Sequence, residues 1–235
     1  MRVLVVYCHP KPDSFAAAMR DAVVDGLNQA GHEPQIVDLY AEDFDPRFGA
    51  HEHAAYENPN ENGQGLERYT DQLRWADGLV FVFPTWWYDM PAMLKGWLDR
   101  VWLPGVAFDL AEGGKRIKPR LQNIRLMAGV TSCGAPWWWS KLVGEPHRRI
   151  LLRGMRALCA PDCRQIWLGC YQMDGSTQRK RATSLASIRR RFARVACAAA
   201  RHVPPLLALP TLPSRACRSS SSSAERTSRR RTCPR

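Results

Sequence analysis

An uninterrupted apolar run from Leu79 to Phe83 restricts the folds that this chain can adopt. A strand that is apolar on both faces is typical of a parallel sheet covered by helices, because both faces are then buried. Pro84 ends the run, since proline lacks the N–H that a sheet requires. Apolar residues from Met90 to Val101 follow at helical spacing, and Pro91 suits the first helical position. The stretch predicts a strand, a short turn and a helix.

The turn of this unit carries three aromatic side chains, Trp86, Trp87 and Tyr88. In a doubly wound sheet, ligands bind outside the carboxyl ends of the strands. Flat aromatic surface at that place suits a planar ligand whose ring edge takes hydrogen bonds from backbone amides. The alternative is that the three residues only cap the core, and their position alone does not decide between the two interpretations.

Further apolar runs predict five strands that alternate with helices, in the order of an α/β fold. The order is flavodoxin-like, with three α-β-α layers and a five-stranded parallel sheet. We expect one domain over residues 1–202. The predicted strands cover residues 3–7, 34–39, 79–83, 123–130 and 164–171, and the predicted helices cover residues 15–30, 66–75, 91–101, 146–158 and 177–202.

The turn after the first strand, from Cys8 to Ser14, is the phosphate position of nucleotide-binding α/β folds. The sequence there matches neither the glycine-rich dinucleotide fingerprint nor the P-loop pattern. A hydroxyl at the start of a helix suits the phosphate of a flavin, and Asp13 or Ser14 also suits plain helix capping. Both interpretations stay open for Ser14.

The exit of the fourth predicted strand reads Thr131-Ser132-Cys133-Gly134, followed by Trp137, Trp138 and Trp139. Small residues there leave backbone amides open at a second strand end, close to a second aromatic cluster. Two aromatic clusters at adjacent strand ends favour a ligand site over core packing. His51 and His53, and separately Cys159 and Cys163, have spacings too weak to predict a metal site, and we expect none.

The charge of the chain is unevenly distributed. The net charge is +12, but residues 1–178 carry 19 basic and 21 acidic side chains, whereas residues 179–235 carry 15 basic and one acidic. The basic character therefore says little about the partner of the folded part. No apolar run approaches a membrane span, and the chain enters a strand at once, so we expect a cytoplasmic protein without stable membrane insertion. The eight cysteines are scattered, which favours free thiols.

Residues 203–235 are rich in proline, serine and arginine and predict a disordered basic tail. No aromatic residue in it can stack on bases, and we expect no nucleic-acid partner. An equally well supported interpretation is that these residues are an abnormal extension, translated from a shifted reading frame.

Several segments resemble one family, the flavodoxin-like NAD(P)H:quinone oxidoreductases of the DT-diaphorase type. Its bacterial relatives include modulators of drug activity and ancillary subunits of potassium-efflux systems. The resemblance covers roughly residues 1–200 and is most specific from Pro84 to Val101. It is also carried by His9 to Met19, Asp38 to Tyr40, Phe44, Pro46 and Pro104 to Phe108.

The resemblance implies a flavin-dependent reductase that takes a hydride from NAD(P)H and passes it to a quinone, most often as a homodimer with the active site at the interface. It favours FAD, with FMN as the alternative, because the long loop after the second strand also resembles FAD-binding members. The choice between NADH and NADPH stays open. The implied catalytic and substrate-side residues are Trp87, Tyr88, Phe108 and Trp139. The implied cofactor-binding residues are His9, Asp13, Ser14, Phe15, Ala16, Pro84, Thr85, Trp86, Trp87, Tyr88, Thr131, Ser132, Cys133 and Gly134.

The sequence departs from the family pattern in two ways. Cys133 stands where the family often has a second glycine. Trp139 stands near the place of a tyrosine that some members use with a histidine to relay charge, and we expect no histidine at the second place. Two other functions remain as alternatives, a flavin-binding regulatory subunit of a potassium-efflux system and an electron carrier of the flavodoxin type.

Overall fold

The computed structural model describes residues 1–111 and 116–196. A five-stranded sheet lies at its centre, and all neighbouring strands are parallel, in the order β2-β1-β3-β6-β7. The prediction of a five-stranded parallel sheet in a flavodoxin-like α/β fold is therefore confirmed. The strands are β1 (Arg2–Tyr7), β2 (Glu33–Asp38), β3 (Gly78–Pro84), β6 (Leu126–Ser132) and β7 (Arg164–Cys170).

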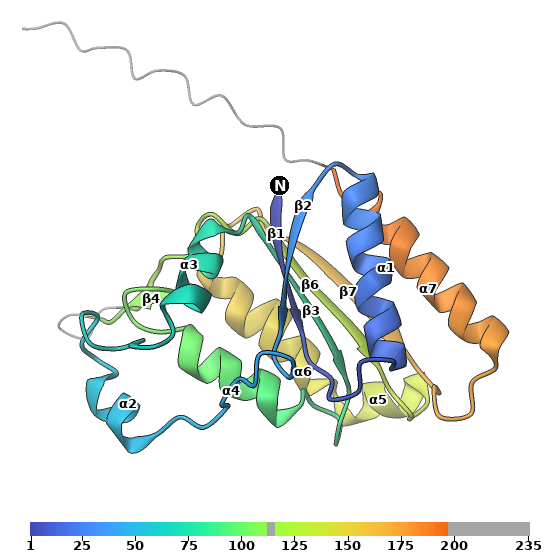
Figure 1. Cartoon of the computed structure of the whole chain (residues 1–235), viewed down its shortest axis with the longest axis horizontal. Helices are drawn as coiled ribbons and strands as arrows, with labels where there is room; N and C mark the ends of the chain where they lie inside the picture. Colours follow the sequence, from blue (N-terminus) through green and yellow to red (C-terminus); the bar gives the residue numbers. More distant parts are fainter. Residues whose placement is uncertain (112–115, 197–235) are drawn as a thin grey trace, which may run out of the picture. The chain divides into compact units, whose positions relative to one another are not determined.

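Helices cover both faces of the sheet (Figure 1). α1 (Phe15–Gln29) and α7 (Gln178–Phe192) pack beside each other on one face. α3 (Glu67–Trp75) and α4 (Ala92–Val101) cover the other, together with the helical segment after α6 (Pro146–Arg149).

Alternate residues of the strands point to these two helical layers. In β3, Val80 and Val82 pack in the α1 and α7 layer, whereas Phe81 and Phe83 pack in the α4 layer. All residues of β3 are buried, because helices cover it on both faces and β1 and β6 flank it. This is the reason for its continuous apolar sequence.

Several predicted boundaries were wrong. The strand predicted at residues 123–130 begins at Leu126, because the Asn123 amide donates to the carbonyl oxygens of Leu73, Arg74 and Ala76 and so holds the chain in a turn. Pro91 is the N-cap of α4, outside the first helical turn. The last helix ends at Phe192, and the part of the prediction after residue 196 lies outside the described residues.

Helical structure also differs from the prediction in three places. The predicted helix at residues 146–158 consists of α6, a π-helical segment (Ile150–Gly154) and a 3₁₀ segment (Met155–Leu158). The polar segment 41–65 contains a short helix, α2 (Ala50–Ala55), and the tryptophan cluster begins a helix, α5 (Trp137–Val143). Two short strands, β4 (Phe108–Asp109) and β5 (Lys118–Pro119), pair in antiparallel fashion.

The described helices include none that is long and apolar enough to cross a membrane. Within the same residues, no group of three or more His, Cys, Asp or Glu side chains is placed to hold a metal ion. The five cysteines in this part are all free and buried. The predicted disordered tail, residues 203–235, lies outside the described residues.

Candidate active site

Three turns meet at the carboxyl ends of β1, β3 and β6. The Cys8 N–H donates to the Val82 carbonyl oxygen at 3.0 Å, and the Thr85 N–H donates to the Ser132 carbonyl oxygen at 2.7 Å. The Thr85 and Thr131 hydroxyl oxygens lie 2.8 Å apart. The structure thus brings together the three segments that the sequence predicted as a cofactor site.

The turn after β3 has an unusual backbone. Trp86 and Asp89 exchange two backbone hydrogen bonds of 3.0 Å, and Trp87 and Tyr88 between them have φ angles of 49° and 64°. A two-residue turn with two positive φ angles usually holds Asn-Gly, because left-handed backbone costs other residues roughly 1–2 kcal/mol each. The Trp87 side chain is 95% exposed, so its packing does not compensate for the free energy that this backbone strain costs. Strain of this kind is often found at functional sites.

Contacts from α5 and α6 hold Tyr88 in this conformation. Trp139 Nε1 donates to the Tyr88 hydroxyl at 2.7 Å. His147 Nδ1 lies 2.7 Å from the Tyr88 carbonyl oxygen, which can only accept, so the Nδ1 nitrogen carries a proton. His147 is 4% exposed, and burial lowers the pKa of its imidazole despite the bond to Tyr88. Tyr88 is therefore anchored through both its hydroxyl and its backbone.

His147 is the residue of this site that the sequence analysis missed. It comes eight residues after Trp139, and its ring meets the edge of Phe83 at 5.9 Å between centroids. Only the sheet brings it next to Tyr88, which lies 59 residues away in the chain. A histidine after Pro146 at a helix start gives no local signal of this contact.

The turn after β1 leads into the first turn of α1. The Ser14 hydroxyl oxygen accepts from the Ala17 N–H at 3.1 Å and lies 3.2 Å from the Tyr7 hydroxyl, so the capping interpretation of Ser14 is confirmed. The N–H groups of Phe15 and Ala16 have no acceptor in the described part of the chain. Together with the helix dipole, these donors suit an anion.

Two more residues of the predicted cofactor site shape the turn after β1. The His9 Nδ1 atom accepts from the Lys11 N–H at 3.0 Å, and its ring lies 6.2 Å from that of Trp86. Asp13 is exposed and pairs with Lys11 at 3.5 Å. The His9 ring therefore places the turn after β1 next to the aromatic turn after β3.

The turn after β6 accommodates the cysteine that departs from the family pattern. The Cys133 thiol is buried, 3.5 Å from the Ser140 hydroxyl. At Gly134, a Cβ atom would overlap the Asp174 carboxylate, which explains the glycine at this position. The N–H groups of Gly134 and Ala135 find no acceptor among the described residues, so backbone donors are open here as expected.

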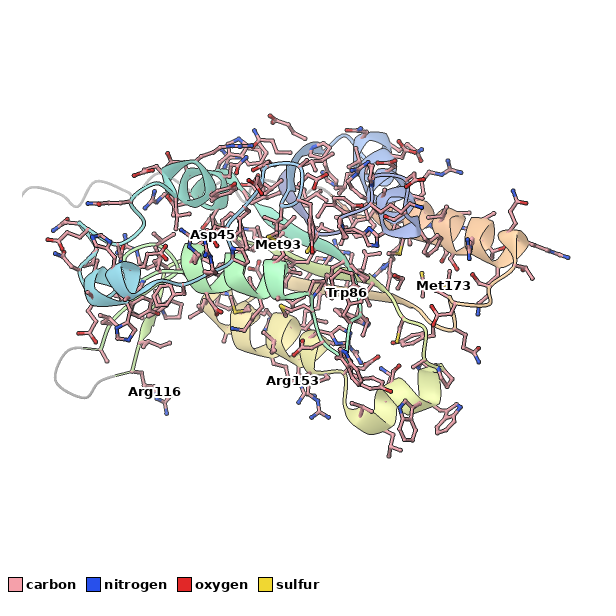
Figure 2. The ribbon with its side chains drawn as sticks, turned by 60° about the horizontal axis from the view of Figure 1, so that its bottom comes forward. Asp45, Trp86, Met93, Arg116, Arg153 and Met173 are labelled. Atoms are coloured by element: carbon pink, nitrogen blue, oxygen red, sulfur yellow. The ribbon has the colours of Figure 1, made fainter. Side chains whose placement is uncertain are left out.

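The features of the three turns fit a planar heteroaromatic group that carries a phosphate. Exposed Trp86 and Trp87 supply flat surface, the amides of Gly134 and Ala135 can bond a ring edge, and the α1 N-terminus can hold the phosphate. Figure 2 places Trp86 at the centre of this end of the protein, between the ribbon of the sheet and α5. Trp137, Trp138 and Trp139 on α5 add further exposed aromatic surface.

Phe108 does not join these turns within one chain. It lies in β4, pairs with Pro119 and packs against the core. Figure 1 shows β4 apart from the end of the sheet where α5 lies.

Comparisons with known proteins agree with this fold. A family model described as a flavodoxin-like fold matches residues 1–184. The ribosyldihydronicotinamide dehydrogenase (quinone) of Pongo abelii is 36% identical over 156 residues, which are 60% of this chain and 67% of the relative. For another curated relative the matched share of its length is only 48%, so the chain spans about half to two thirds of such relatives.

Solved structures give the same result. An NAD(P)H:quinone oxidoreductase of Methanothermobacter marburgensis has a TM-score of 0.70 at 26% identity, over 82% of this chain and 96% of that one. An FMN-dependent NADH-azoreductase of Bacillus anthracis, in complex with FMN, has a TM-score of 0.67 over 83% of this chain and 99% of that one. At 16% identity, this second likeness shows the fold alone.

Proposed function

The chain belongs to the flavodoxin-like fold family, and on that premise we propose that it is an NAD(P)H-dependent flavoenzyme that reduces quinones by two electrons. The resemblance to quinone oxidoreductases is confirmed by relatives named as quinone dehydrogenases and NAD(P)H:quinone oxidoreductases. No name among these relatives favours the two alternatives, a potassium-efflux subunit and an electron carrier.

One observation carries the proposal. An exposed aromatic turn, held in a strained conformation by Trp139 and His147, lies beside a strand end with open amides and a helix N-terminus with open amides. Each feature alone has an ordinary structural explanation. Their meeting at the ligand-binding edge of a parallel sheet favours a bound flavin.

A bound flavin supplies the hydride chemistry that no side chain can perform. The role of the chain is to bind the flavin and to orient it toward the nicotinamide and the quinone. In this proposal Ser14 and the first turn of α1 hold the phosphate, the residues from Pro84 to Tyr88 hold one edge of the ring, and Thr131 to Gly134 hold another. The exposed rings of Trp87 and Trp139, with Tyr88 held by Trp139, then form the wall against which nicotinamide and quinone stack in turn.

The cofactor and the assembly form the finer part of the proposal. We propose FAD as the flavin, with FMN as the alternative. We also propose a cytoplasmic homodimer in which Phe108 of a second copy completes the substrate side. The exposed aromatic residues around the site, Trp86, Trp87, Trp137 and Trp138, support such an interface, because aromatic side chains are enriched at interfaces.

A turnover assay tests the proposed function. Purified protein loaded with flavin is mixed with NADH or NADPH, and consumption of the nicotinamide cofactor is followed with and without menadione. We expect consumption that depends on menadione and yields its two-electron hydroquinone. Flavin-loaded protein that consumes neither cofactor in the presence of menadione, benzoquinone or a nitro-aromatic acceptor would contradict the proposal.

A further inference from the structure

A basic cavity lies along the outer edge of β7, between that strand and the segments α5 and α6. It has two adjoining parts with volumes of about 410 Å³ and 260 Å³, and Lys141 and Arg148 line both. The smaller part is also lined by Arg149 and Arg153. Figure 2 shows Arg153 pointing away from the ribbon. None of these four residues belongs to the candidate flavin site.

The cavity has an excess of positive charge. Among the residues that the structure describes, four cationic side chains line its smaller part, and Glu145 is the only acidic side chain there. Arg149 and Arg153 form no ion pair within the described residues. The mutual repulsion of these cations is relieved when an anion binds between them.

Glu145 holds two of the cations in place. Its carboxylate is 4% exposed and accepts from Lys141 Nζ at 2.5 Å, from Arg148 Nη1 at 3.1 Å and from the Tyr171 hydroxyl. Burial opposes ionisation, but these three donors outweigh it and lower the pKa of the carboxyl. The φ angle of Glu145 is 46°, and Gly144 before it has a φ of 98°. A strained backbone thus positions a buried anion that fixes the directions of Lys141 and Arg148.

The larger part of the cavity lies beside the carboxyl half of β7 and is also lined by residues of α7. Trp137, Trp167 and Tyr171 line it, together with residues from the carboxyl half of β7. Cys170 of that half pairs in register with Ser132, which lies in the predicted ring-binding turn. The cavity therefore has aromatic walls near the flavin site and cations farther along the same strand.

We propose that this cavity binds the adenosine end of NADPH, with the 2′-phosphate bonded by Arg149 and Arg153. The inference rests on the proposed function and makes it more specific, because only the 2′-phosphate distinguishes NADPH from NADH. Guanidinium groups match a phosphate dianion in charge and geometry, and the tryptophan walls suit an adenine ring. The cavity assigns NADPH as the reductant.

Direct binding tests this site without flavin turnover. Calorimetric titrations of the full chain compare 2′,5′-ADP with 5′-AMP, which differ by the 2′-phosphate. We expect 2′,5′-ADP to bind at least about tenfold more tightly, since a charge-assisted bond contributes more than a neutral one. In the double variant R149Q/R153Q this preference should vanish. Arg190→Gln on the exposed side of α7 is the matched control and should keep it.

Three results would overturn the inference. The first is equal affinity for 2′,5′-ADP and 5′-AMP in the unaltered protein. The second is an unchanged preference in R149Q/R153Q. The third is inorganic phosphate binding as tightly as 2′,5′-ADP, which would indicate a plain phosphate site.

Steady-state rates separate this inference from the proposed function. With menadione as acceptor, the inference predicts kcat/KM for NADPH at least about tenfold above that for NADH, and a loss of this ratio in R149Q/R153Q through KM. Equal kcat/KM for both cofactors contradicts the inference and leaves the proposed function intact. Absence of turnover with either cofactor contradicts the proposed function, and the titrations then decide the phosphate site alone.

Discussion

At the scale of single residues, the conformation of Trp87 and Tyr88 links the sequence to the proposed chemistry. Both have positive φ angles, and neither is buried in the core. Trp139 and His147 hold Tyr88 from α5 and α6, so the aromatic turn is fixed before any ligand arrives. A turn fixed in this way loses little conformational entropy when a planar ring stacks on it.

A substitution that relieves the backbone strain should raise the stability of the protein and lower its affinity for flavin. Trp87→Asn places a residue tolerant of left-handed backbone at the tip of the turn, and little apolar burial is lost because Trp87 is 95% exposed. We expect the free energy of unfolding of the flavin-free protein to rise by about 1 kcal/mol in urea titrations, and flavin affinity to fall. Trp138→Asn is the control: it lies in α5 and is 60% exposed, so it should give no gain. Equal stability changes in both variants would contradict this account.

The buried His147 predicts a pH dependence of stability. Burial lowers the pKa of its imidazole from 6.5, so the unfolded chain binds a proton at a higher pH than the folded protein does. The free energy of unfolding should therefore decline as the pH falls below 6.5 toward the folded pKa. His147→Asn keeps an N–H donor for the Tyr88 carbonyl and should make this part of the profile flatter.

The matched control for His147 is His53→Asn on α2. His53 is exposed, whereas His147 is buried against Tyr88. Chemical denaturation between pH 5 and 8 measures both profiles. If the free energy of unfolding of His147→Asn declines with falling pH as steeply as that of the unaltered protein, His147 is not the cause of the decline.

At the scale of helices and strands, the prediction succeeded where one residue period was long and unbroken. The run in β3 and the helical spacing of α1 each gave the right element. α5 was missed because its seven residues begin with three tryptophans and are too few to show a period. The π-helical segment after α6 keeps the apolar pattern of an ordinary helix, so no local signal distinguishes it.

The packing of α4 gives a test at this scale. A Cβ atom at Gly96 would overlap the backbone of Pro46, so Gly96→Ala must displace α4 or the loop that it packs on. We expect a loss of about 1–3 kcal/mol in the free energy of unfolding. Gly154→Ala is the control, because nothing lies within 4 Å of a Cβ atom there. Denaturant titration of both variants measures the difference, and equal stabilities would contradict the close packing of α4 on Pro46.

At the scale of the whole molecule, the order of elements followed from the sequence, and so did the meeting of three turns at one edge of the sheet. Apolar runs that alternate with helices predict a parallel sheet, and such sheets bind ligands at their carboxyl edge. The contact of His147 with Tyr88 and the cavity around Arg149 and Arg153 could not be predicted, because both depend on how distant segments pack. The fold was thus more predictable than the side-chain contacts that support the site.

Flavin binding by the purified chain tests the central claim most directly. FAD or FMN is added to folded protein, free flavin is removed by dialysis, and the retained flavin is measured by its visible absorbance and identified after release. The account predicts yellow protein that retains about one flavin per chain, and a loss of retention in Trp87→Asn. Folded protein that stays colourless with both flavins would contradict it.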